Sequence, residues 1–161
     1  MGSKPDHLSR HKAYNFISAN SLATLATTDD QGQPHASAVH FVVHKDLTLY
    51  FTTRVEARKF KNLVAKPTVA MAITDEAGMV TVQLTGKAER VESLKTEQML
   101  LMELWSLRFN EAIWPIPAVQ MFEQGATNRI AVIKIVPLEM TYATFKTQTS
   151  GKYQPFFLKV I

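Results

Sequence analysis

The chain has 161 residues, of which 46% are hydrophobic and 20% charged, a length and composition typical of one globular domain. It contains no cysteine, which excludes a disulfide scaffold, a thiolate zinc site, an iron–sulfur cluster and a cysteine nucleophile. The net charge of +4 is too small to indicate a nucleic-acid partner, and no apolar run reaches the ~20 residues of a membrane span. With no signal segment visible, we expect a soluble, cytoplasmic protein without a membrane partner.

The first third of the chain predicts one helix followed by three strands. Apolar residues recur at helical spacing over residues 6–20. Threonines and small apolar residues over 22–28, and alternation over 35–44 and 47–53, are typical of strands. The first two strands flank a turn rich in Asp, Gly and Pro, so they form a predicted hairpin.

The middle of the chain predicts a short helix and two further strands. Residues 55–65 carry apolar side chains three or four apart, which is an amphipathic helix pattern. Strands follow over 68–74 and 79–91, separated by a turn. Gly86 interrupts the second of them, and a glycine at such a place predicts a bulge or a bend that curls a sheet.

The last third predicts the longest helix, over 92–110, then an irregular segment over 112–124 whose prolines prevent one regular element. The nearly continuous apolar run 130–136 predicts a strand covered on both faces. Pro137 predicts a bulge or a strand edge, and alternation returns over 138–145.

Antiparallel hairpins dominate this order of elements, which excludes a doubly wound parallel sheet. We predict a mainly β (α+β) fold: a six-stranded antiparallel split β-barrel with flanking helices. The whole chain, 1–161, forms one domain, with its core over about 10–145.

The sharpest local feature lies where the third strand runs into the short helix. Thr52 and Thr53 end the strand, and Arg58 and Lys59 stand in the first turn of the helix. Threonine hydroxyls, two cations and a helix N-terminus together favour a bound anion such as a phosphate. The alternative is a solvated basic helix face, and Glu56 suits an anion site only if it points away.

Several motifs in the same order resemble the pyridoxamine 5′-phosphate oxidase-like family of FMN-binding split-barrel proteins. They are LATLATT at 22–28, GQPHASAVHF at 32–41, LYFTT at 49–53, the RK…NL…PTVAM segment at 58–71 and VQLTGKAERV at 82–91. The resemblance covers residues 10–93 well and runs more loosely to 145. It implies a homodimer with FMN at the subunit interface.

The same resemblance implies the cofactor-binding residues. Thr52, Arg58 and Lys59 match the positions that grip the phosphate, and the segment 37–40 matches the strand along the isoalloxazine ring. Thr81 stands where the family often has Gln, and Ala57 where it commonly has Ser. The expected set is Ser37, Ala38, Val39, His40, Phe51, Thr52, Thr53, Arg58, Lys59 and Thr81.

The remaining candidates concern chemistry. His40 is the candidate catalytic residue, with a half-buried strand histidine as the alternative. Trp105 and Trp114 are candidates to cover the flavin from the partner subunit, or else core or dimer contacts. No metal site is expected, because His40 and His44 lie too far apart along a strand to share an ion. The apolar run 130–133 must also be shielded from solvent, which favours a homodimer.

We therefore expect an FMN-dependent oxidoreductase acting on a small organic molecule. The alternative is a non-catalytic flavin- or heme-binding module of the same fold, for which His40 or His35 would supply the axial ligand. The family also includes relatives that bind a deazaflavin. True pyridoxamine phosphate oxidases carry a C-terminal Arg-x-His segment. Residues 147–161 contain neither Arg nor His, so we do not expect that activity.

Overall fold

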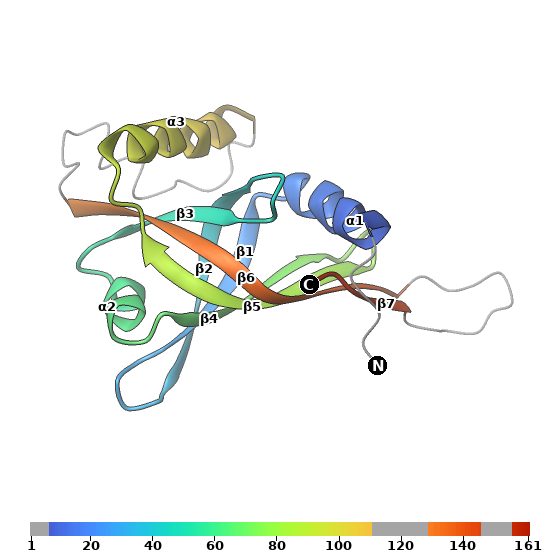
Figure 1. Ribbon diagram of the computed structural model, residues 1–161, viewed down its shortest axis with the longest axis horizontal. Helices are drawn as coiled ribbons and strands as arrows, with labels where there is room; N and C mark the ends of the chain where they lie inside the picture. The colour runs from blue at the N-terminus through green and yellow to red at the C-terminus, as the bar shows by residue number, and fades with distance from the viewer. Residues whose placement is uncertain (1–6, 111–128, 146–155) are drawn as a thin grey trace, which may run out of the picture.

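The computed structural model describes residues 7–110, 129–145 and 156–161. Its elements follow the predicted order with small shifts at their ends (Figure 1). They are α1 (His7–Ser18), β1 (Leu22–Thr28), β2 (Pro34–Val43), β3 (Leu49–Arg54), α2 (Arg58–Ala65), β4 (Thr68–Asp75), β5 (Val80–Arg90), α3 (Leu94–Asn110), β6 (Ile130–Thr144) and β7 (Phe156–Lys159). The predicted segment 112–124 lies outside the described residues.

Six of the strands form a closed antiparallel barrel, which confirms the predicted fold. The order is β3-β2-β1-β4-β5-β6, and a further pairing between β3 and β6 closes it. In that closing ladder Leu49 faces Ile135 and Arg54 faces Ile130. The short strand β7, which the sequence pattern did not predict, adds to the far half of β6.

The core lies inside the barrel, because alternate residues of each strand point inward. Leu25, Leu49, Phe51, Ile73 and Val82 are all fully buried. Helix α1 adds its buried face to this core, and α2 packs mainly against β1 and β3. Figure 1 shows α2 close to the end of the barrel where the β1–β2 hairpin projects.

Helix α3 covers a second, smaller apolar cluster at the start of β6. Leu100 and Leu101 of α3 pack there with Ile130 and Val132, while Ile133 points into the barrel core. The apolar run 130–133 is therefore covered on both faces by this chain itself. The argument that it requires a partner subunit was wrong, because the sequence pattern alone does not show where α3 packs.

The predicted bulge at Gly86 is confirmed. The register between β5 and β6 shifts between Thr85 and Gly86, so that Thr85 faces Glu139 and Gly86 faces Pro137. A Cβ atom on Gly86 would lie 2.7 Å from the carbonyl oxygen of Val136. Only glycine lets the two backbones approach this closely.

None of the described helices is long and apolar enough to cross a membrane.

Candidate functional site

A pocket of about 530 Å³ lies between α2 and the hairpin of β1 and β2. We call it the α2 pocket. It is lined by Thr27, Pro34, His35, Ala36, Ser37, Arg58 and Lys59. Three of the predicted cofactor-binding residues, Ser37, Arg58 and Lys59, are thus brought together from segments twenty residues apart in the sequence.

Local structure explains why these side chains meet. Strand alternation puts His35 and Ser37 on the same face of β2 as the buried Val39. On α2, the Asn62 side chain is 4% exposed and donates to the Thr27 hydroxyl at 3.0 Å. This buried hydrogen bond holds the helix against β1, so that its first turn opens onto the hairpin.

The first turn of α2 has no side-chain cap. Ala57 is the N-cap residue, with extended backbone angles and no side-chain hydrogen bond to the helix. The Ser that the family commonly has here would supply such a bond. The helix N-terminus is thus left with its partial positive charge beside Arg58 and Lys59.

Two cations of the α2 pocket lack a carboxylate partner within the described ranges. Burial lowers the pKa of Lys59, and the nearby Arg54 lowers it further. Glu56 does not compensate them, because it pairs with Arg129. This ion pair and its hydrogen bonds also hold the pKa of Glu56 below its usual range. The requirement that Glu56 point away from the anion site is met.

Sequence reasoning missed the other lining residues of the α2 pocket. Thr27 lies one residue before the end of β1, and Pro34, His35 and Ala36 begin β2. His35 shares the face of Ser37 by simple alternation, which was the available signal. Its approach to Arg58 depends on where α2 packs, and the local sequence does not show this.

The other predicted residues on β2 and β3 lie close by in the sequence but do not line this pocket. Val39 and Phe51 are core residues, 4% and 0% exposed. The Thr53 side chain is buried and donates to the Arg54 carbonyl at 3.4 Å. Thr52 is half-buried opposite Val132. Ala38 and His40 alternate onto the opposite face of β2 from Ser37.

Thr81 lies apart from the α2 pocket, at the start of β5. It is 8% exposed, and its hydroxyl lies 3.1 Å from the Ile73 carbonyl and 3.2 Å from the Thr74 hydroxyl. These contacts engage the hydroxyl within the chain. Trp105 belongs to α3, and Trp114 lies outside the described residues.

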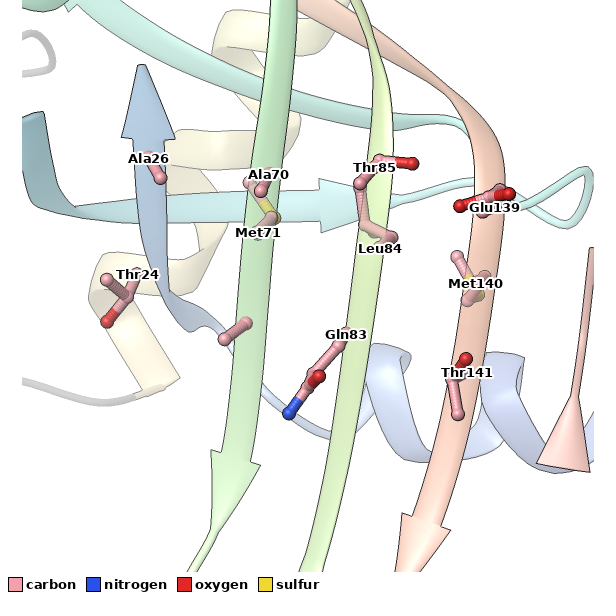
Figure 2. Close-up of a pocket in the computed structure, with 11 residues that line it drawn as sticks. Thr24, Ala26, Ala70, Met71, Gln83, Leu84, Thr85, Glu139, Met140 and Thr141 are labelled. Atoms are coloured by element: carbon pink, nitrogen blue, oxygen red, sulfur yellow. The ribbon is translucent and has the colours of Figure 1, made fainter. Parts of the chain in front are cut away.

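A second pocket, of about 360 Å³, lies on the outer surface of the barrel across β1, β4, β5 and β6. Figure 2 shows the lining side chains along these four neighbouring strands, with Gln83 and Glu139 as the longer polar ones. The outward-pointing residues are Thr24, Ala26, Ala70, Ala72, Gln83, Thr85, Glu139 and Thr141. We call this surface the outer sheet face. Glu139 is its one ionisable side chain, so the face is nearly uncharged.

Among the described residues, no group of three or more His, Asp or Glu side chains is placed to hold a metal ion.

The fold and the α2 pocket define a closed antiparallel barrel with a cationic pocket beside its second helix. Residues 9–142 match the family model described as pyridoxamine 5′-phosphate oxidase. The chain therefore belongs to the pyridoxamine 5′-phosphate oxidase family, as the sequence motifs predicted. A search of curated proteins found no significant match.

Solved structures with the same fold have different named roles. The conserved hypothetical protein Rv2991 from Mycobacterium tuberculosis is 23% identical, with a TM-score of 0.66 over 86% of this chain and 88% of that one. The heme storage protein HutZ from Vibrio cholerae is 17% identical, with a TM-score of 0.61 over 92% and 93%. An F420 reductase is 21% identical, with a TM-score of 0.61 over 78% and 93%. At sequence identities this low, the structural similarity establishes the fold alone.

Proposed function

We propose that this protein binds FMN, with the phosphate in the α2 pocket, and is a cytoplasmic oxidoreductase acting on a small organic molecule. One observation carries the proposal: Arg58 and the half-buried Lys59 line one pocket without a described carboxylate partner. A buried cation is costly unless it is paired. A phosphate dianion in this pocket supplies the missing negative charge.

The residues present fit FMN. The Arg58 guanidinium and the Lys59 ammonium donate to the phosphate oxygens, and the uncapped start of α2 adds its N–H groups. The Ser37 hydroxyl stands on the same pocket wall. The resemblance to the family implies that the ring system would lie along β2 over residues 37–40. FMN, when bound, supplies hydride-transfer chemistry, while the protein supplies binding and orientation.

FMN titration tests the site. Followed by flavin fluorescence, Arg58→Ala and Lys59→Ala should each weaken FMN binding by about 1.5–3 kcal/mol, the worth of a hydrogen bond to a charged group. Lys61→Ala, an exposed lysine of the same helix, is the matched control and should bind like the wild type. Riboflavin, which lacks the phosphate, should bind much more weakly. Unchanged FMN affinity in both pocket variants would contradict the phosphate assignment.

We also propose that the active form is a homodimer whose second copy covers the outer sheet face. A solvated sheet face normally carries charged side chains. The outer sheet face carries Ala or Thr on each of its four strands, and Glu139 is its one ionisable side chain (Figure 2). Small side chains permit close packing of a second sheet. Light scattering should give about twice the 18.1 kDa of one chain. Ala70→Arg in the middle of the face should give monomers, whereas Lys87→Arg at an exposed position of β5 should not.

Heme is the second candidate cofactor, because HutZ, a heme storage protein, shares the fold. Both ring nitrogens of His35 have partners, Asp29 and Arg58, and His40 is the second histidine of β2 that could supply an axial ligand. The absorption spectrum of the purified protein separates the two cofactors. Flavin bands support FMN, and a Soret band that His40→Ala abolishes supports heme.

A further inference from the structure

A chain of three side chains runs along the wall of the α2 pocket. His35 Nε2 lies 3.1 Å from Asp29 Oδ2, and His35 Nδ1 lies 3.3 Å from a terminal guanidinium nitrogen of Arg58. Asp29 comes from the turn before β2, and Arg58 from the first turn of α2. The histidine is thus the link between the turn and the cation that we expect to meet the phosphate.

The carboxylate end of this chain is fixed in place. Asp29 Oδ1 accepts from the backbone N–H groups of Gln31 at 3.1 Å and Gln33 at 2.8 Å. The other oxygen is then directed at His35. The hydrogen bonds from His35 and Gln33 lower the pKa of Asp29, so the group stays a carboxylate and acts only as an acceptor.

The two neighbours determine the proton on His35. A carboxylate only accepts hydrogen bonds, and a guanidinium only donates them. The 3.3 Å contact with Arg58 is a hydrogen bond only if Nδ1 offers its lone pair to the guanidinium, which places the ring proton on Nε2 toward Asp29. The charged groups that face His35 are Asp29 on one side and Arg58 and Lys59 of α2 on the other.

An anion changes this balance. Oxygens of a phosphate at Arg58 compete with Nδ1 for the guanidinium donors and place negative charge on the cationic side of the ring. A proton taken from solvent onto Nδ1 then turns the ring into a donor toward the anion, while Nε2 keeps its bond to Asp29. Histidine is the side chain that can make this change between pH 5 and 8.

We propose that His35 is a proton-linked third donor of the α2 pocket, so that binding of a phosphate monoester is coupled to proton uptake at Nδ1. Asp29 acts as a positioning residue for the ring. The inference rests on the proposed function, because it deepens the description of the same phosphate site. It predicts that affinity for the anion rises as the pH falls from 8 to 6.

The test uses FMN and two substitutions of one residue. Gln at position 35 retains one acceptor and one donor group, so it can imitate neutral histidine, but it cannot take up a proton. One linked proton changes the affinity by at most tenfold per pH unit. We expect the FMN affinity of the wild type to gain roughly tenfold between pH 8 and pH 6 relative to His35→Gln. His35→Ala should bind more weakly than the wild type at both pH values, and His11→Gln, an exposed histidine of α1, is the control.

Calorimetry in two buffers of different ionisation enthalpy counts the protons directly. At pH 7 the wild type should take up a larger fraction of a proton per FMN than His35→Gln, and Asp29→Asn should lie between them. The ionisation of the FMN phosphate itself near pH 6 cancels in this comparison. Equal proton uptake and parallel pH profiles for the wild type and His35→Gln, with both binding FMN, would overturn the inference.

Sulfate separates this inference from the FMN proposal, because it stays a dianion throughout the pH range. If FMN does not bind, sulfate should still raise the melting temperature of the wild type more at pH 6 than at pH 8, with no such difference for His35→Gln. A sulfate effect without FMN binding overturns the FMN proposal and supports the His35 inference. No pH-dependent difference in either assay overturns the inference.

Discussion

Lys59 shows most clearly how a binding residue can act against stability. Because burial lowers its pKa from the ordinary value of 10.5, the folded protein disfavours the charged form. At neutral pH this lysine therefore contributes unfavourably to folding, and its contribution improves as the pH rises toward 10.5. A bound phosphate reverses the effect by providing the opposite charge.

Lys59→Met should consequently separate stability from binding. The free energy of unfolding at pH 7, measured by urea titration without ligand, should stay the same or increase, while FMN affinity falls. The wild type alone should gain stability from this residue as the pH rises toward 10.5. FMN should raise the melting temperature of the wild type, because it binds the folded state. A large loss of ligand-free stability in the variant would contradict this description of Lys59.

Ala57 allows a separate test of the start of α2, by stability alone. Its extended backbone already suits an N-cap, and only the side-chain acceptor is missing. Ala57→Ser should stabilise the protein without ligand by about 1 kcal/mol. Ala57→Val, which has bulk without a hydroxyl, is the control. Equal melting temperatures for the Ser and Val variants would show that the hydroxyl forms no cap.

At the scale of elements, the contact between β5 and β6 depends on one missing side chain. A Cβ atom at position 86 would meet the Val136 carbonyl oxygen at 2.7 Å and the Ile135 side chain at 3.0 Å. Gly86→Ala should therefore cost about 1–3 kcal/mol, the usual penalty for overpacking. Lys87→Ala, the exposed neighbour, should cost far less. Urea denaturation measures the free energy of unfolding of each variant. Similar losses for Gly86→Ala and Lys87→Ala would mean that the two strands separate easily.

Most strands of the barrel were predictable because they alternate between buried and exposed residues, and the start of β6 because its apolar run is nearly continuous. The bulge between β5 and β6 was predictable from Gly86 and Pro137. Strand β7 was not, since it has four residues and exists through its pairing with β6. The candidate site was also predictable only in part. Arg58 and Lys59 were visible in a helix-start motif, whereas the contact of His35 with Arg58 requires the packing of α2 on the hairpin.

At the scale of the whole molecule, the distribution of cations bears on the substrate. Oxidation of pyridoxamine phosphate requires a grip on two phosphates, that of the cofactor and that of the substrate. In the proposed function Arg58 and Lys59 bind the first. In the described part of the chain Arg129 is paired with Glu56, and Lys134 lies 3.1 Å from Glu89. A lone lysine such as Lys159 lacks the planar fork that suits phosphate.

We therefore expect no peroxide release above background when the FMN-loaded protein meets pyridoxamine phosphate in air. A peroxidase-coupled assay measures it, with free FMN as the blank. Turnover on the order of 10 per second, the median for enzymes, would show that the chain does hold a second phosphate.

The pairing of β3 with β6 that closes the barrel also affects the order in which strands pair during folding. Strand β3 pairs with β2 next to it in the sequence, but with β6 across about half of the chain. Pairings between distant segments form slowly, because the long loop between them must first be closed. The β1–β2 and β4–β5 hairpins should thus gain protection in pulse-labelling hydrogen exchange before the β3–β6 ladder. The wall of the α2 pocket formed by β1 and β2 would then exist before the barrel closes.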